Sequence, residues 1–247
     1  MVSLCILATH SEGAVPENVF SLAREIFRHF DRVIVSTTTM DSVSAVRGAV
    51  PGVETHVSPN DSYDIGLFYK AWAALPLSDR EAVTRLGFVN DSNILLCRLD
   101  NVFAWGEVNS AGFWGLTDNI EIQYHIQTPF LVFEKRAIPI LEEFFDLCGV
   151  ATQWPLIKNK HVLRETVINE FEVKLTGFMT SKNITTAVYT PCVALGFRNN
   201  VSILNPRALL AVGHPVIKRQ VAKGIKGGEI VGEDVSRARA FRYTYRN

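Results

Sequence analysis

The stretch LGFVNDS, residues 86–92, is an apolar run that ends in an amide, a carboxylate and a hydroxyl. Such a run is typical of a buried strand, and polar residues follow where the strand ends. Before it, the chain alternates apolar runs with segments of helical periodicity. The runs are SLCILAT (3–9), DRVIVST (31–37) and the weaker VETHV (53–57). Strands that alternate with helices predict an α/β fold with a mostly parallel central sheet and helices on both faces.

Helical periodicity appears in two of the segments between these runs. Pro16 opens a segment in which apolar side chains recur at three- and four-residue spacing, and the same spacing returns over 64–75. This is the pattern of helices that pack one face on a sheet. A short helix is also expected over 79–85, and the second half predicts further elements. The expected strands there are 113–117, 124–134 and 185–193, and the expected helices are 137–148 and 160–182.

The composition excludes several classes of protein. The chain has 247 residues, of which 47% are hydrophobic, and its 25 basic residues balance its 25 acidic ones. A protein that coats nucleic acid needs a strong basic excess, so we expect no nucleic-acid partner. No apolar run approaches the length that spans a bilayer, so we expect no transmembrane segment. The four cysteines are scattered without a CxxC pair, which predicts reduced thiols in a cytoplasmic protein and no zinc site.

We expect a single α/β domain over residues 1–222, followed by a Gly- and Arg-rich tail over residues 223–247. The length suits one core of this type. The first residues predict a buried strand rather than a signal peptide, because no basic stretch precedes the apolar run. In the tail, six basic residues against three acidic ones allow a weak attraction to an anionic membrane surface. A solvated, disordered tail is the alternative.

The polar residues that follow the expected strands are the first candidates for a binding site, because ligands of parallel sheets bind beyond the carboxyl ends of the strands. Thr9, Ser36 and Thr37 end the first two strands and are expected to line a nucleotide. Asp91 follows the fourth strand, where its carboxylate could hold Mg²⁺ or Mn²⁺ against a diphosphate. An ordinary Asx-type turn over residues 90–92 is the alternative interpretation.

A second candidate cluster opens the expected helix over 64–75. Asp64 stands at the N-cap position, and Gly66 is expected to let a ligand approach the first turn closely. Lys70 would then reach a phosphate. A capped amphipathic helix with an exposed lysine is the alternative interpretation.

A third cluster lies between residues 114 and 127. Asp118 follows an apolar strand and is expected at the mouth of the site, where a carboxylate can act as general base on a hydroxyl. His125 and Gln127 share one face of the next expected strand. A lone strand histidine is more often a hydrogen-bonded structural residue than a catalyst, so His125 carries little weight.

Two later segments add candidates. Glu165 and Glu172, seven residues apart, share a face of the expected helix 160–182, for which a solvated face is the default interpretation. His214 and Lys218 follow a turn and could serve as a metal ligand and a phosphate partner. The sequence contains no GxGxxG, Walker, GxSxG or HExxH motif, which removes the commonest nucleotide-binding, hydrolase and protease interpretations.

Taken in order, five segments of the chain resemble the rhamnan synthesis protein F family, whose members are glycosyltransferases that build rhamnose-containing polysaccharides. The resemblance runs over about residues 1–220 and includes a closing HPVIK segment over 214–218. The five segments are DIGLFYK (64–70), VNDS (89–92), FWGLTD (113–118), HIQTPFLVF (125–133) and FEVKLT (171–176).

The resemblance implies a GT-A-like nucleotide-sugar-binding fold, in agreement with the α/β expectation. GT-A enzymes usually carry an Asp-x-Asp pair, whereas residues 90–92 of this chain keep one carboxylate. The implied need for a divalent cation, Mn²⁺ or Mg²⁺, is therefore weak or dispensable. Asp91 is the first expected metal ligand and His214 the second. The implied donor is a dTDP-, UDP- or GDP-linked sugar such as rhamnose, and the implied acceptor is a glycan hydroxyl.

The resemblance also implies an inverting transfer, because the family is thought to make α-linkages from β-linked activated rhamnose. Such a transfer needs a carboxylate base, for which Asp118 is the first choice and Glu172 the second. A degenerate nucleotide-sugar-binding or scaffold protein without transferase activity is the alternative function. The expected contacts to donor or cation are Thr9, Ser36, Thr37, Asp64, Lys70, Asn90, Asp91, Ser92 and Lys218.

Overall fold

The computed structural model describes residues 2–11 and 13–222, so the expected tail over 223–247 lies outside the described residues. Strands and helices alternate through the first 90 residues as expected. Val83–Arg85, expected at the end of a helix, belong instead to the fourth strand, where Val83 pairs with Val2. The elements are β1 (Val2–Ala8), α1 (Glu17–Ile26), β2 (Arg32–Thr37), α2 (Met40–Ala49), β3 (Glu54–Val57), α3 (Tyr63–Ala73), α4 (Leu77–Ala82) and β4 (Val83–Asn90).

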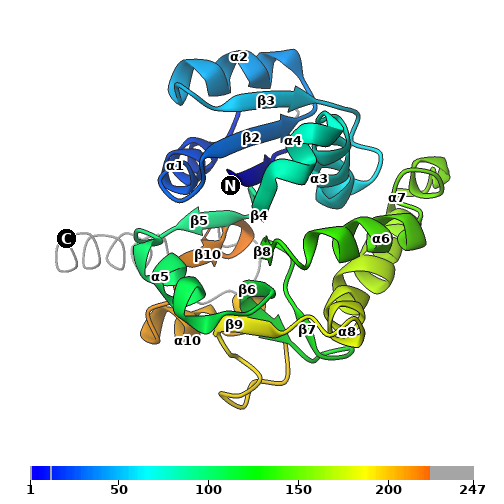
Figure 1. Cartoon of the computed structure of the whole chain (residues 1–247). Coiled ribbons are helices and arrows are strands. Elements are labelled where there is room, and N and C mark those ends of the chain that lie inside the picture. The colour runs from blue at the N-terminus through cyan, green and yellow to red at the C-terminus, as the bar shows by residue number, and fades with distance from the viewer. Residues whose placement is uncertain (1, 12, 223–247) are drawn as a thin grey trace.

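The second half adds the strands beyond β4 at one edge of the sheet. It also supplies α6, α7 and α8, which lie on one face of the sheet (Figure 1). Its elements are β5 (Asn93–Leu95), α5 (Asp100–Asn109), β6 (Phe113–Asn119), β7 (His125–Ile126), β8 (Phe130–Glu134), α6 (Ile138–Cys148), the 3₁₀ turn η1 (Trp154–Leu156), α7 (Lys160–Thr166), the π-helical segment η2 (Val167–Glu172), α8 (Val173–Ser181), β9 (Thr186–Thr190), α9 (Val201–Leu204), α10 (Pro206–Ala211), β10 (Val216–Lys218) and α11 (Arg219–Ala222).

The central sheet has the strand order β3-β2-β1-β4-β8-β6-β7, and β9 also pairs with β6. The first four strands of this order are mutually parallel. β8 runs antiparallel to both β4 and β6, so β6 points the same way as β4, and β9 is parallel to β6. A separate pair, β5 and β10, lies beside the end of β4. The expected mostly parallel sheet is confirmed.

Two hydrophobic cores cover the two faces of the sheet. Along β1, Leu4 and Ile6 belong to one core and Cys5 and Leu7 to the other, as the two-residue alternation of a strand requires. Helices α3, α6 and α8 cover the first face, while α1, α2 and α5 cover the second. Helices on both faces are therefore confirmed.

The expected strand over 124–134 is wrong, because the chain forms two strands there. Gly115 pairs with Leu131, whereas Asp118 pairs with Ile126, so the ladder along β6 shifts by two residues between β8 and β7. The extra residues fall at 127–129, where Pro129 has no N–H for the ladder and its carbonyl instead accepts a hydrogen bond from the N–H of Asn90. Helix α5 is not among the elements that the sequence pattern predicts.

Candidate active site

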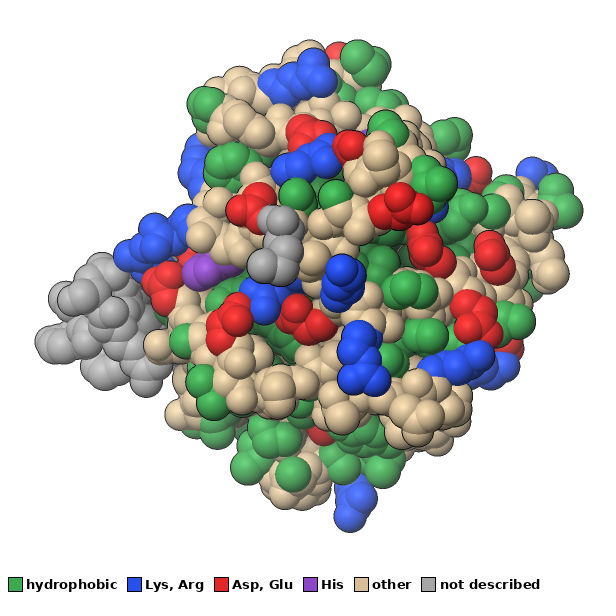
Figure 2. All heavy atoms as spheres, in the orientation of Figure 1, with side chains coloured by type: hydrophobic (Ala, Val, Ile, Leu, Met, Phe, Trp, Pro, Cys, Tyr) green, Lys and Arg blue, Asp and Glu red, His purple; other side chains and the backbone are tan. Residues whose placement is uncertain are grey.

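A cleft of about 620 Å³ opens where β4 and β6 end, beside α3, η2 and β10. This is the carboxyl end of the parallel strands, the place where sheets of this class bind ligands. Acidic and basic side chains gather over the middle of the face seen in Figure 2. The polar side chains of the cleft wall come from segments far apart in the sequence; they include Asp64, Asn90, Ser92, Asn119, Glu121, His125, Gln127, Thr128, Arg164, Glu172, Asn200, Lys218 and Gln220.

One wall of the cleft is a continuous chain of hydrogen bonds. Lys218 Nζ donates to Ser92 Oγ over 3.3 Å, and Ser92 Oγ donates to Asn90 Oδ1. The amide of Asn90 donates from Nδ2 to Asp64 Oδ2. The Ser92 N–H also donates to Asn90 Oδ1 over 3.1 Å, which is an Asx turn of the kind considered for residues 90–92. The chain links α3, the end of β4 and the end of β10.

Lys218 is the last residue of β10, and the pairing of that strand with β5 places it opposite Asn93. Burial in the cleft wall lowers the pKa of its ammonium to about 8, although the charges of Glu172 and Asp64 oppose this shift. The ammonium therefore stays mostly protonated at neutral pH. It can act there as a fixed positive charge.

Glu172 ends the π-helical segment η2 and faces the same cleft. Burial, and then the charge of Asp64, raises the pKa of its carboxyl to about 7. Lys218, a hydrogen bond from Thr128 and the charge of Arg164 act in the opposite direction. A carboxyl whose pKa lies near neutral pH is suited to exchange a proton with a substrate hydroxyl. π-Helical segments inside helices occur frequently at functional sites.

Tyr63 adds a strained backbone position to the cleft. This first residue of α3 has a φ of 52°, in the left-handed region that non-glycine residues rarely adopt. Its hydroxyl donates to the carbonyl of Lys160 over 2.9 Å, which ties α3 to the start of α7. Strained residues cluster at active sites because the surrounding structure holds them there.

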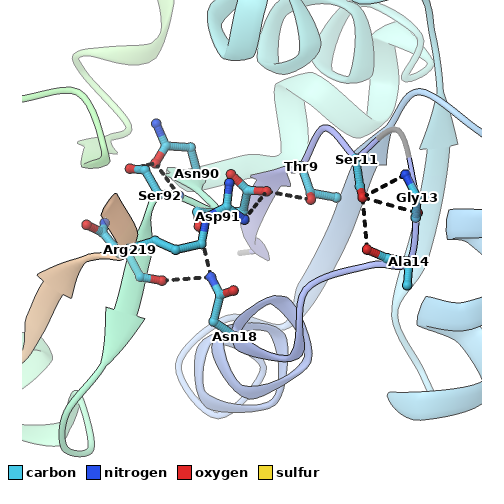
Figure 3. Close-up of polar contacts among 10 residues, drawn as sticks. Thr9, Ser11, Gly13, Ala14, Asn18, Asn90, Asp91, Ser92 and Arg219 are labelled. Carbon is cyan, nitrogen blue, oxygen red and sulfur yellow. Dashed lines mark hydrogen bonds and ion pairs between the residues drawn. The ribbon is translucent and has the colours of Figure 1, made fainter. Parts of the chain in front are cut away.

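Asp91 does not line this cleft. Its Oδ2 accepts a hydrogen bond from Thr9 Oγ1 at 2.9 Å and pairs with Arg219 Nη1 at 3.2 Å (Figure 3). Its carbonyl accepts from Asn18 Nδ2 over 2.8 Å. Burial raises the pKa of the Asp91 carboxyl, and the charge of Arg219 opposes that shift. The carboxylate is thus already bound to a cation of the protein itself.

The residues expected to hold a metal do not fit one. His214 is 3% exposed, and its Nδ1 lies 2.8 Å from Thr190 Oγ1 beside a separate small cavity. Within residues 2–11 and 13–222, three metal-ligating side chains come together only at Glu25, His29 and Asp100, and neither Asp91 nor His214 belongs to such a group. The metal site expected at Asp91 and His214 therefore has no support in this arrangement.

The cluster of Glu25, His29 and Asp100 lies away from the cleft, at the end of α1 and the start of α5. Arginines already supply its positive charge: Arg28 contacts Glu25 and Asp100, and Arg98 contacts Asp100 at 3.1 Å. Glu25 Oε1 also accepts the N–H of Leu99 over 2.6 Å. The cluster joins two helices by ion pairs.

Three expected nucleotide contacts are buried behind the site. Thr9, Ser36 and Thr37 are 2%, 0% and 0% exposed. Ser36 Oγ donates to the carbonyl of Leu67 over 2.9 Å, which fastens α3 to β2. A second cavity of about 480 Å³ does open near the ends of β1 and β2, but other residues line it, among them Ser11, Val15 and Asp41.

The first turn of α3 differs in detail from expectation. The N-cap is Ser62, and Asp64 is the second helical residue, with Oδ1 accepting the N–H of Ile65 over 3.1 Å. A Cβ at Gly66 would lie 2.3 Å from the Cβ of Ser62, so the close approach at Gly66 is made by the cap residue rather than by a ligand. Lys70 pairs with Asp61 and is not part of the cleft wall.

Asp118 is also turned away from the cleft, although its neighbour Asn119 lines it, because successive strand residues point to opposite sides. Asp118 is 4% exposed, and its Oδ1 accepts the N–H of Val193 over 3.0 Å. Burial raises the pKa of its carboxyl, while the backbone hydrogen bond from Val193 and, to a smaller extent, a hydrogen bond from Tyr124 oppose the shift. Asp118 thus anchors the segment that follows β9 through the N–H of Val193.

Sequence reasoning missed several side chains of the cleft. Arg164, Thr128 and Asn119 all line it, and none was a candidate. Arg164 stands eight residues before Glu172, a spacing that places both on one side of the helical segment. That spacing is the one signal that could have indicated Arg164. His125, given little weight, and Gln127, expected on the same strand face, also line the cleft.

Comparisons with known proteins give a likeness in shape. No family model matches the chain, and no curated protein matches its sequence. The resemblance to the rhamnan synthesis protein F family therefore stays a prediction. No helix among the described residues is long and apolar enough to cross a membrane.

Among solved structures, a 4-diphosphocytidyl-2C-methyl-D-erythritol synthase from Anaerococcus prevotii is 10% identical and has a TM-score of 0.48, with 97% of each chain covered. A glycosyltransferase involved in glycosylation of the major capsid of PBCV-1 is 8% identical with a TM-score of 0.42, covering 97% of this chain and 99% of that one. A CMP:2-keto-3-deoxy-manno-octonic acid synthetase complexed with CTP is 8% identical with a TM-score of 0.44, covering 86% and 99%.

Proposed function

We propose that this chain is a glycosyltransferase of GT-A type that moves a sugar from a nucleoside diphosphate donor to a hydroxyl of a glycan. The observation that carries the proposal is that Glu172 and Lys218 line one cleft at the carboxyl ends of the parallel strands and that each acts on the other through its charge. The cleft volume of about 620 Å³ lies within the range of sites for small molecules and cofactors.

The roles of the two charged groups follow from the chemistry of transfer. As the acceptor oxygen attacks the anomeric carbon, the bond from that carbon to the diphosphate breaks and its electron pair leaves with the diphosphate. Glu172, in its ionised form, takes the proton of the acceptor hydroxyl. Lys218 stabilises the negative charge that develops on the diphosphate. Asp64 and Asn90 belong to the same wall as Lys218, which the hydrogen bonds through Ser92 hold together.

The finer assignment rests on the sequence resemblance. We propose a dTDP-, UDP- or GDP-linked deoxyhexose such as rhamnose as donor, and transfer with inversion. We propose that the nucleoside of the donor binds in the cavity near the ends of β1 and β2. Glu172 replaces Asp118 as the proposed base because Glu172 lines the cleft and Asp118 does not.

A panel of dTDP-, UDP- and GDP-sugars, each with oligosaccharide acceptors, tests the proposal by release of nucleoside diphosphate. We expect at least one donor to turn over, and E172Q to reduce that release strongly. E165Q is the matched control, since Glu165 lies on the same helical segment but not in the cleft wall. A donor that binds and never turns over favours the binding or scaffold protein without transferase activity. No binding by any donor contradicts the whole proposal.

A further inference from the structure

Three charged side chains that line the cleft, Asp64, Glu172 and Lys218, interact electrostatically. The negative charges of Asp64 and Glu172 both act on the ammonium of Lys218, and the charge of Asp64 also acts on Glu172. Proteins commonly hold a divalent cation between one or two carboxylates and the phosphate oxygens of a ligand, and two carboxylates that line one cleft could provide such a setting. Here an ammonium group of the chain itself stands with them.

Lys218 is held by its own hydrogen bond and by the contacts of the next residue, Arg219. Its Nζ donates to Ser92 Oγ over 3.3 Å. The next residue, Arg219, donates its backbone N–H to the carbonyl of Ser92 over 2.6 Å. The guanidinium of Arg219 then pairs with Asp91 at 3.2 Å. β10 and the first residue of α11 are thus fastened to the turn after β4 by backbone and side chain together.

Asp91 is therefore not available in the role that the sequence predicted for it. Its carboxylate faces Thr9 and Arg219, away from the cleft, and Arg219 already neutralises it (Figure 3). A divalent cation at Asp91 would have to displace a paired guanidinium at a largely buried position. Among the carboxylates that line the cleft, Asp64 and Glu172 both act on Lys218 through their charges.

We propose that Lys218 is the resident cation of this site: it takes the place of a divalent metal ion and binds the diphosphate of the donor directly, while the Asp91–Arg219 pair positions it. The inference rests on the proposed transferase function and specifies how that site binds the donor. An ammonium is a compact point charge with three donors, well suited to phosphate oxygens. Its protonated form also gains from a bound diphosphate, which adds negative charge beside it.

The first experiment measures binding of UDP, dTDP, GDP and inorganic pyrophosphate by calorimetry, in EDTA and in Mn²⁺. For the wild-type chain we expect the best of these ligands to bind equally well, within about twofold, in both conditions. K218Q should weaken that binding by about tenfold or more, the loss expected for a charge-assisted contact. K218R keeps the charge and should retain most of the affinity. K182Q is the control, because Lys182 pairs with Glu143 on the surface.

The second experiment measures Mn²⁺ binding by electron paramagnetic resonance, with circular dichroism as the check on folding. Removal of the ammonium in K218A leaves Asp64 and Glu172 without their neighbouring cation, so K218A should bind Mn²⁺ more tightly than the wild type. Addition of E172Q to K218A should remove that gain.

The outcomes separate the inference from the proposed function. Diphosphate binding that requires Mn²⁺ in the wild type overturns the inference and leaves the transferase proposal standing. Wild-type affinity in K218Q, or no gain of Mn²⁺ binding in folded K218A, also overturns the inference alone. Failure of all four ligands to bind in either condition overturns both.

Discussion

The carboxyl group of Glu172 is placed so that its protonation changes near neutral pH. Its pKa is raised to about 7, so below that pH the group is increasingly protonated and loses its ability to accept a proton. The pKa of Lys218 is lowered to about 8, so above that pH its positive charge is lost. The fraction of molecules with both groups in the required forms is therefore highest between these values and falls on either side.

This pair predicts a bell-shaped pH profile for kcat/KM with limbs at about 7 and about 8. The acid limb reports ionised Glu172 and the basic limb reports protonated Lys218. The measurement is initial-rate kinetics across the range with the donor that turns over. In K218R the basic limb should disappear, because the guanidinium stays charged throughout. A profile without an acid limb would remove Glu172 from the role of base.

Asp91 allows a second prediction at the same scale, since a positioning residue and a metal ligand respond differently to substitution. D91N removes the charge that holds Arg219 and should lower the free energy of unfolding by about 1–3 kcal/mol, as loss of a charge-assisted hydrogen bond does. It should also raise KM for the donor more than it lowers kcat, because Lys218 is less well held. Urea unfolding and steady-state kinetics measure the two effects.

Coupling between Asp91 and Arg219 supplies the control for that prediction. D91N and R219Q should be non-additive in a double-mutant cycle, since each removes the same contact. Recovery of D91N activity by high Mn²⁺ would indicate a metal ligand instead, and additive losses would show that the pair is not a unit.

At the scale of elements, the break between β7 and β8 shapes the cleft. The residues between them, Gln127, Thr128 and Pro129, all line it. Both strands pack closely against Gly115 in β6. A Cβ there would lie 2.4 Å from Ile126 Cγ2 and 2.8 Å from the carbonyl oxygen of Phe130. Both contacts lie next to the break, one on each strand.

We predict that G115A destabilises the fold by about 1–3 kcal/mol, because the added methyl group overpacks a closed position. G48A is the matched control: Gly48 lies inside α2, where a Cβ would meet nothing within 4 Å. That substitution should be neutral or stabilising by up to about 1 kcal/mol. Chemical denaturation of the two variants measures the difference. Equal stability of G115A and the wild type would show that the strands can move apart there.

The elements also show what the sequence can and cannot indicate. Runs such as residues 3–9 and 31–37 predict strands correctly because burial on both faces leaves few polar residues in them. Helix α5 escapes prediction because only Val102, Phe103 and Gly106 are buried, so its pattern is weak. The register shift that splits residues 124–134 depends on pairing with β6, which no local pattern encodes.

The candidate site could be predicted only in part, for a similar reason. Asp64, Asn90, Ser92 and Lys218 were candidates and line one cleft. Asp91, adjacent to two of them, does not, because the direction of a side chain after a strand end depends on its partner Arg219, distant in sequence. Glu172 is only the second choice from the sequence, because its expected helix also fits a plain structural role. The π-helical segment that ends at Glu172 has no clear sequence signature.

At the scale of the whole molecule, the cores on both faces of the sheet and the cleft residues described above lie within residues 2–222. We therefore predict that a chain of residues 1–222 folds and keeps its turnover on a soluble acceptor. Its melting temperature and kcat/KM, compared with those of the full chain, provide the check. Loss of turnover with folding intact would show that residues 223–247 contribute to the chemistry.

The proposal that a cleft built from α3, β4, η2 and β10 transfers a sugar is tested most directly by single-turnover release of nucleoside diphosphate in the wild type, E172Q and D118N. With the donor that turns over, we expect E172Q to slow release by about 10²–10⁴-fold, the range for loss of general base catalysis, while the donor Kd changes little. D118N should stay close to the wild type once its folding is verified. Normal release by E172Q together with loss of release in D118N would contradict this account and place the base at Asp118.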